Sequence, residues 1–158
     1  MANTQSMCTS FMGELMTATH NFGTAPIRAA STADTFKGAL YLASATINAS
    51  TTAYSVTGEV TGIGYTAGGV TVTNATPPTA TNSSATAGVA YWTPSASLTY
   101  TSVTLTTAFD AVLIYNSTQS NKAVSVHTFG SQTITAGTFT LTMPSNTTST
   151  ALLRLATT

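Results

Sequence analysis

Apolar and polar residues alternate along most of the chain from residue 35 onward, with the two-residue period of a strand that has one buried face. The clearest runs cover residues 36–42, 70–73, 89–92, 98–105, 111–115, 122–129, 139–143 and 151–155. The phase of the alternation slips near Thr101 and Ser102, which predicts a bulge or a sharp bend there. The pattern therefore predicts an all-β fold, a jelly-roll-like β-sandwich of about eight strands.

The first 24 residues follow a different pattern. Apolar side chains recur there at spacings of three to five residues, which suits one face of a short helix. Two interpretations remain open: a helix packed on its own sheet, or an apolar arm that docks on a neighbouring subunit. The second interpretation gives the candidate interface residues, which are Met7, Phe11, Leu15, Met16 and Phe22. The chain thus divides into an N-terminal arm or short helix, 1–24, and a single β-sandwich domain, 25–158.

Two further segments are predicted to be irregular. Residues 58–69 contain repeated glycines, which offer several positions for a positive φ and hence for tight turns. Residues 77–88 contain no apolar side chain larger than Ala apart from two prolines, which is typical of a surface loop.

Charged residues are scarce: four Lys and Arg balance four Asp and Glu in 158 residues. Globular proteins usually have about a quarter of their residues charged. Nucleic-acid binding and docking on anionic membranes both need clustered Lys and Arg, so we expect neither partner. No run of about 18 apolar residues predicts a membrane span. The N-terminus lacks the pattern of a secretory signal.

Few residues are suited to catalysis or metal binding. His20, His127 and Cys8 lack the paired spacing of metal ligands, and His127 is predicted to be exposed or to face an interface. Glu59 and Asp110 would have to face each other across a cleft to act as catalytic carboxylates. Acids at the start of strands and loops more commonly accept hydrogen bonds from the backbone. We therefore expect no catalytic residue, no metal site and no cofactor.

Two blocks of the sequence resemble a known family. They are DTFKGALYLASATINASTTAYSVTGEVTGIGYTAGG at 34–69 and AFDAVLIYNSTQSNKAVSVHTFGSQTITAGTFTLTMP at 108–144. Together they resemble small virion structural proteins of tailed bacteriophages, a family that includes head-decoration or cement proteins. The most similar positions, expected to serve in turns and packing, are Tyr54, Gly58, Glu59, Gly64, Tyr65, Gly68 and Gly69.

The resemblance implies a protein that is not an enzyme and that stabilises a capsid in many copies. Its expected location is the outer surface of the virion head, after synthesis in the host cytoplasm. Its expected partners are the major capsid protein and further copies of itself, in a homo-oligomer for which a trimer is favoured over a dimer. A hydroxyl-rich surface with few charges suits this role, because crowded copies repel one another little and modest contacts add up across a lattice.

The alternative function is also that of a bacteriophage protein, but one located in the tail instead of the head. In a tail or fibre module that binds a host surface glycan, Tyr91, Trp92 and Tyr100 would form a stacking platform. Trp92 is also suited to the hydrophobic core, and the platform can form only if Trp92 is exposed. The copy number per virion separates a cement protein from a tail module.

Overall fold

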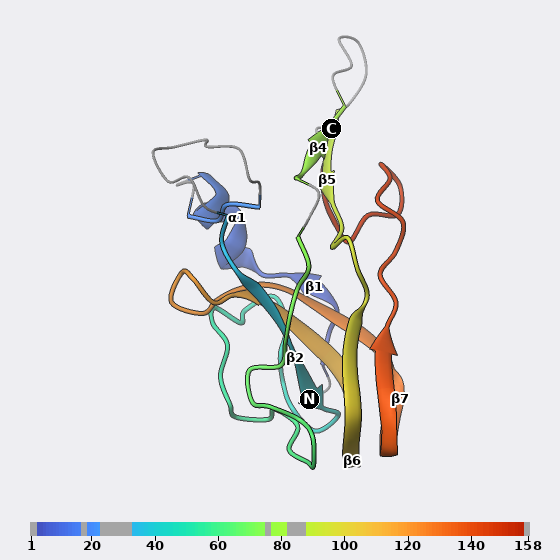
Figure 1. Ribbon diagram of the computed structural model, residues 1–158. Helices are drawn as coiled ribbons and strands as arrows, with labels where there is room; N and C mark the ends of the chain where they lie inside the picture. Colours follow the sequence, from blue (N-terminus) through green and yellow to red (C-terminus); the bar gives the residue numbers. More distant parts are fainter. Residues whose placement is uncertain (1–2, 17–18, 23–32, 75–76, 82–87, 157–158) are drawn as a thin grey trace.

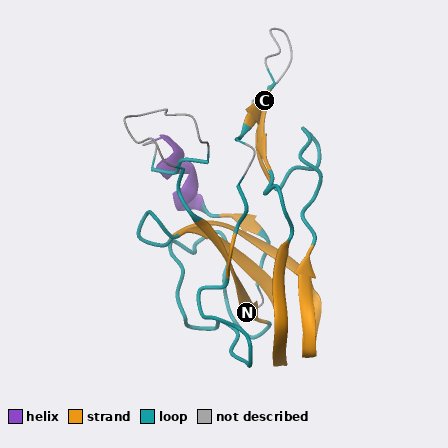
Figure 2. Cartoon of the chain, in the orientation of Figure 1, coloured by secondary structure: helices purple, strands orange, loops and turns teal. Residues whose placement is uncertain are grey.

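The computed structural model describes residues 3–16, 19–22, 33–74, 77–81 and 88–156. Within these ranges the chain is all-β, with eight strands in two antiparallel sheets and one short helix (Figures 1 and 2). The strands are β1 (Ser6–Met7), β2 (Phe36–Leu42), β3 (Val70–Thr71), β4 (Thr79–Ala80), β5 (Val89–Trp92), β6 (Leu98–Asn116), β7 (Lys122–Leu141) and β8 (Leu153–Ala156). The helix is α1 (Thr9–Met16).

The larger sheet has the strand order β1-β7-β6-β2-β3, and the smaller one has the order β4-β5-β8. The all-β class with eight strands is therefore confirmed, although these strand orders do not by themselves establish a jelly-roll connection. In Figure 1 the smaller sheet and α1 lie at the same end of the molecule, beyond the larger sheet. This placement puts α1 and the C-terminal end of the chain at that end, while the N-terminus lies beside the larger sheet.

A long hairpin of β6 and β7 forms the centre of the larger sheet. Its register runs from Asn116 opposite Lys122 at the turn to Leu98 opposite Leu141 at the open end. The predicted slip is confirmed, because the register shifts between Tyr100 and Val103 and Ser102 has a φ of 53°. The segments expected as separate strands at 122–129 and 139–143 are instead parts of one bulged strand, β7.

The core lies on the part of β6 that β2 and β7 flank. The run from Ala111 to Ile114 is fully buried, which confirms the predicted central strand. The loop that follows β2 covers one face of this sheet: the ring of Tyr54 stacks on Tyr115 at 4.7 Å, and that of Tyr65 stacks on Tyr100 at 6.0 Å. Because both faces are covered here, the strand is apolar at consecutive positions instead of at alternate ones.

The glycine-rich loop adopts the predicted left-handed backbone at Gly58, Gly64, Gly68 and Gly69. Gly69 has the least space. Its φ is 71°, and a Cβ atom there would lie 1.7 Å from the carbonyl oxygen of Gly38 on β2. Only glycine therefore lets this turn lie directly against the sheet.

Two expectations are corrected at the edges of the fold. The predicted loop at 77–88 contains the short strand β4, while residues 82–87 lie outside the described ranges. Met7 belongs to β1 and pairs with Ser125 of β7, so the helix begins only at Thr9. An extended segment therefore joins the N-terminus to the sheet before the helix starts.

Candidate interaction site: an apolar groove

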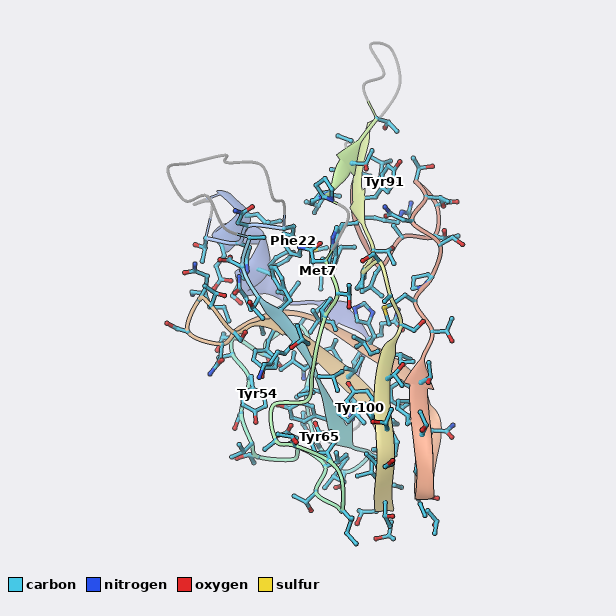
Figure 3. All side chains as sticks on the ribbon, viewed as in Figure 1. Met7, Phe22, Tyr54, Tyr65, Tyr91 and Tyr100 are labelled. Carbon is cyan, nitrogen blue, oxygen red and sulfur yellow. The ribbon has the colours of Figure 1, made fainter. Side chains whose placement is uncertain are left out.

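An open groove of about 90 Å³ lies between α1 and the smaller sheet. Its lining is almost wholly apolar, and Figure 3 shows Met7, Phe22 and Tyr91 around it. The N-terminal segment and residue 22 provide one wall and the floor, and strands β5 and β8 of the smaller sheet, with Pro78 just before β4, provide the other wall. The residues that line it are Met7, Phe11, Leu15, Phe22, Pro78, Ala90, Tyr91, Trp92, Leu153 and Leu155.

Aromatic packing fixes the floor of the groove. The ring of Phe22 stacks on Phe36 of β2 at 4.4 Å and meets Trp92 edge to face at 4.8 Å. Asn74 connects the two walls, because its Nδ2 donates to the Phe22 carbonyl at 2.6 Å and its Oδ1 accepts from Trp92 Nε1 at 2.8 Å. The indole N–H is thus satisfied, and the groove presents carbon atoms to a partner.

Two hydrogen bonds to one carboxylate hold α1 in place. Glu14 accepts from Lys122 Nζ on β7 at 2.6 Å and from His20 Nε2 at 2.7 Å. Burial of the Glu14 carboxyl opposes its ionisation, but the hydrogen bonds from Lys122 and His20 and the positive charge of Lys122 outweigh burial and hold its pKa below the usual value. The ion pair between Glu14 and Lys122 therefore holds α1 on the sheet that contains β7.

A buried amide sets the tautomer of His20. Asn116 Oδ1 accepts from the N–H groups of Thr118 and Gln119, so its Nδ2 is the group that faces His20 Nδ1 at 3.0 Å. His20 Nδ1 therefore accepts a hydrogen bond, and the proton of the neutral ring is on Nε2, directed at Glu14. The same Asn116 amide also donates to Asp34 Oδ2 at 2.7 Å.

The five candidate interface residues divide into three groups. Phe11 and Phe22 are buried within the chain and contribute only to the floor of the groove. Met7 and Leu15 are half-buried at the groove and remain accessible to a partner. The side chain of Met16 lies outside what the structure describes. The interpretation of a helix packed on its own sheet thus accounts for α1, and the accessible apolar surface lies beside it.

The opposite wall of the groove was not predicted as a capsid or subunit interface, although Tyr91 and Trp92 were candidates for the glycan platform. Leu155, on β8, is 43% exposed, and Tyr91 is half-buried. The alternation in 89–92 and 151–155 predicted these strands but gave no sign that they would face α1, because the groove brings together segments that are far apart in the sequence. Such long-range proximity leaves no local pattern in a sequence.

The proposed glycan platform of Tyr91, Trp92 and Tyr100 is not assembled. Trp92 and Tyr100 are each 2% exposed, and the Tyr100 hydroxyl donates to the Gly38 carbonyl at 2.8 Å. Both rings are therefore core residues, which leaves Tyr91 as the one partly accessible aromatic ring of the three. A sugar cannot stack on ring faces that the protein covers.

All four carboxylates accept hydrogen bonds from groups of the fold. Glu14 and Asp34 hold the N-terminal segment, and Asp110 accepts from Asn3 Nδ2 at 2.6 Å. Glu59 is buried, and accepts from the hydroxyls of Tyr54 and Tyr65 and from the Gly68 N–H at 2.6–2.7 Å. Glu59 and Asp110 thus belong to separate structural networks.

A serine and a histidine also lie in contact. Ser125 Oγ and His127 Nε2 are 2.8 Å apart on β7, and burial lowers the imidazole pKa to about 4. His127 is half-buried, and β1 pairs with β7 at the preceding residues Ser125 and Val126; the sequence predicted that it is exposed or faces an interface. Ser125 is 1% exposed, and Cys8 is buried with its thiol pKa raised to about 11. Neither side chain is placed to attack a substrate.

Within the described ranges, no cluster of three or more His, Cys, Asp or Glu side chains is placed to bind a metal ion. The same ranges contain no helix long and apolar enough to cross a membrane. No family model, no curated protein and no solved structure matches this chain. On the described surface, the groove is an apolar site, and its chemistry is the burial of apolar side chains.

Proposed function

We propose that this protein is a capsid cement protein of a tailed bacteriophage, which binds major capsid subunits and stabilises the head without catalysing a reaction. The observation that carries the proposal is the apolar groove between α1 and the smaller sheet. A partner that inserts an apolar side chain there gains the burial of apolar surface, about 25 cal/mol per Å².

The distribution of charge supports attachment through apolar contacts. The carboxylates are engaged within the fold, as described above, and the groove walls carry no charged side chain among their lining residues. Few charges are thus left to form salt bridges with a partner. We expect binding that depends little on ionic strength, because screening acts only on charges.

The tail module that binds a glycan is the weaker alternative, because two of its three aromatic rings are buried. A cement protein needs no such platform. It needs many copies with modest contacts, which together hold neighbouring subunits by avidity.

A binding experiment on purified heads that lack the protein tests the proposal. Replacing Leu155 by Ser removes an apolar side chain from the rim of the groove, and it should weaken binding about tenfold or more, as expected for a lost Leu contact. Ile63→Ser is the matched control, since Ile63 is 77% exposed and belongs to the glycine-rich loop, residues 58–69. Figure 1 shows this loop at the end of the molecule opposite α1.

Both variants are first compared with the wild type by thermal unfolding, so that a folding defect is not read as lost binding. The proposal expects that about 1 M NaCl leaves wild-type binding nearly unchanged. Release of the protein by salt, or equal binding by Leu155→Ser and the wild type, would count against it.

A further inference from the structure

The outer edge of β7 is unpaired along most of its length. β7 lies between β6 and β1, and β1 pairs with it only at Ser125 and Val126. From Thr128 to Leu141 this edge has no strand beside it in the described part of the chain. Such an edge presents a row of backbone N–H and C=O groups that can pair with another chain.

The sequence lacks two of the usual protections of an edge strand. No charged residue occurs between Lys122 and Arg154, and no proline occurs in β7 before Pro144. Bulges protect the part nearer the turn, where the register with β6 shifts repeatedly and Ala136 has a φ of 46°. In Gly137–Leu141 the bulge is on the other strand: two residues of β6, Thr101 and Ser102, lie opposite Thr138, while Phe139, Thr140 and Leu141 pair with β6 one to one.

The two faces of this open segment have distinct chemistry. Thr138 and Thr140 are exposed on one face. Phe139 and Leu141 are half-buried on the other, where the Phe139 ring lies 5.1 Å from Phe109 and 6.0 Å from Tyr100. A strand added at this edge would pair its backbone and would also cover the exposed part of Phe139.

We propose that Gly137–Leu141 pairs antiparallel with the same segment of a second copy of this chain, about a two-fold axis at Phe139. The sequence next to Phe139 is symmetric, because Thr138 precedes it and Thr140 follows it. Two antiparallel copies therefore place a threonine opposite a threonine on each side of Phe139. Thr138 then lies opposite Thr140 of the partner subunit, and the two Phe139 rings lie side by side. The pairing joins two five-stranded sheets into one continuous sheet.

A second copy of the chain fits this edge because two identical edges of this composition do not repel each other. The edge carries no charge, so identical segments meet without like-charge repulsion. A two-fold axis also closes the assembly, since pairing uses the Gly137–Leu141 edge of each copy once. The basic unit is then a dimer, in place of the trimer that the resemblance favours.

A charge-swap experiment on the full chain tests the register. In Thr138→Lys/Thr140→Lys, each new lysine lies opposite a lysine of the partner, and the dissociation constant measured by sedimentation velocity should rise about fivefold or more. In Thr138→Lys/Thr140→Glu, each lysine lies opposite a glutamate, and dimerisation should return to the wild-type level or above. Thr61→Lys/Thr66→Lys adds the same charge at exposed positions of the glycine-rich loop and should dimerise like the wild type.

Three results would overturn the inference: a monomeric wild-type protein over the whole dilution series, a Lys/Lys variant that dimerises like the wild type, or a Lys/Glu variant as weak as the Lys/Lys variant. The Lys/Glu variant also controls for folding, since it changes the same two positions. The inference does not depend on capsid binding. Loss of head binding by Leu155→Ser with an intact dimer, or the reverse, tells the two proposals apart.

Discussion

The Glu14 carboxylate accepts a hydrogen bond of 2.6 Å from the Lys122 ammonium group, across 108 positions of the chain. In a protein with only eight charged residues, two of them are used to fix the N-terminal helix at the β6–β7 turn. The helix in turn forms one wall of the apolar groove. These two charges thus act inside the fold, and the groove beside α1 is lined by apolar side chains.

Replacing Glu14 by Gln should destabilise the protein by about 1–2 kcal/mol at pH 7, because a charged hydrogen bond to Lys122 and His20 is lost. The pKa of Glu14 is lowered in the folded state, so its contribution is full above the ordinary carboxyl pKa and is lost as the pH falls through the folded value. Urea unfolding at pH 7 and at about pH 3 measures both effects. A Glu14→Gln variant that is equally destabilised at both pH values would contradict this account.

Acidification should also lower the stability of the fold through His127. Its folded-state pKa of about 4 lies below the ordinary value of 6.5, so the unfolded chain binds a proton first as the pH falls. Stability should therefore decrease between pH 6.5 and pH 4. A His127→Gln variant should lose much of this decrease, as followed by thermal unfolding across the range. An unchanged pH dependence in the variant would mean that other groups cause it.

Substitutions at two glycines test whether the glycine-rich loop lies directly against β2. Gly69→Ala should destabilise the fold by at least about 2 kcal/mol, because φ is positive there and the new Cβ would overlap the Gly38 carbonyl of β2. Gly130→Ala should be nearly neutral, since the nearest atom to its Cβ would be Gln132 Nε2 at 4.0 Å. Denaturant unfolding of both variants measures the difference. Equal stabilities would show that the loop does not lie against β2.

Much of the fold could be predicted from the sequence, because strand periodicity is a local signal. The bounds of β2 and β5 and the bulge near Ser102 follow directly from the alternation of apolar and polar residues. The joining of the later runs into one long β7 could not be predicted in this way. Its bulges interrupt the alternation without ending the strand, so the pattern looked like separate strands.

The groove could be predicted only in part. Helical spacing identified Met7, Phe11 and Leu15 as apolar positions of the N-terminal segment, and these residues do line it. The facing wall depends on how β5 and β8 pack against a segment more than 70 residues away, which no periodicity encodes. The burial of Trp92 has the same origin, since Phe22 and Asn74 enclose it from distant parts of the chain.

The most direct test of the central proposal is a reconstruction, by electron cryomicroscopy, of the phage particle that carries this protein. The account predicts density for the protein at the copy number of the capsid lattice, on the outer surface of the head, with the groove between α1 and β8 against the major capsid protein. Density confined to the tail, or a head-bound protein whose groove faces solvent, would contradict it.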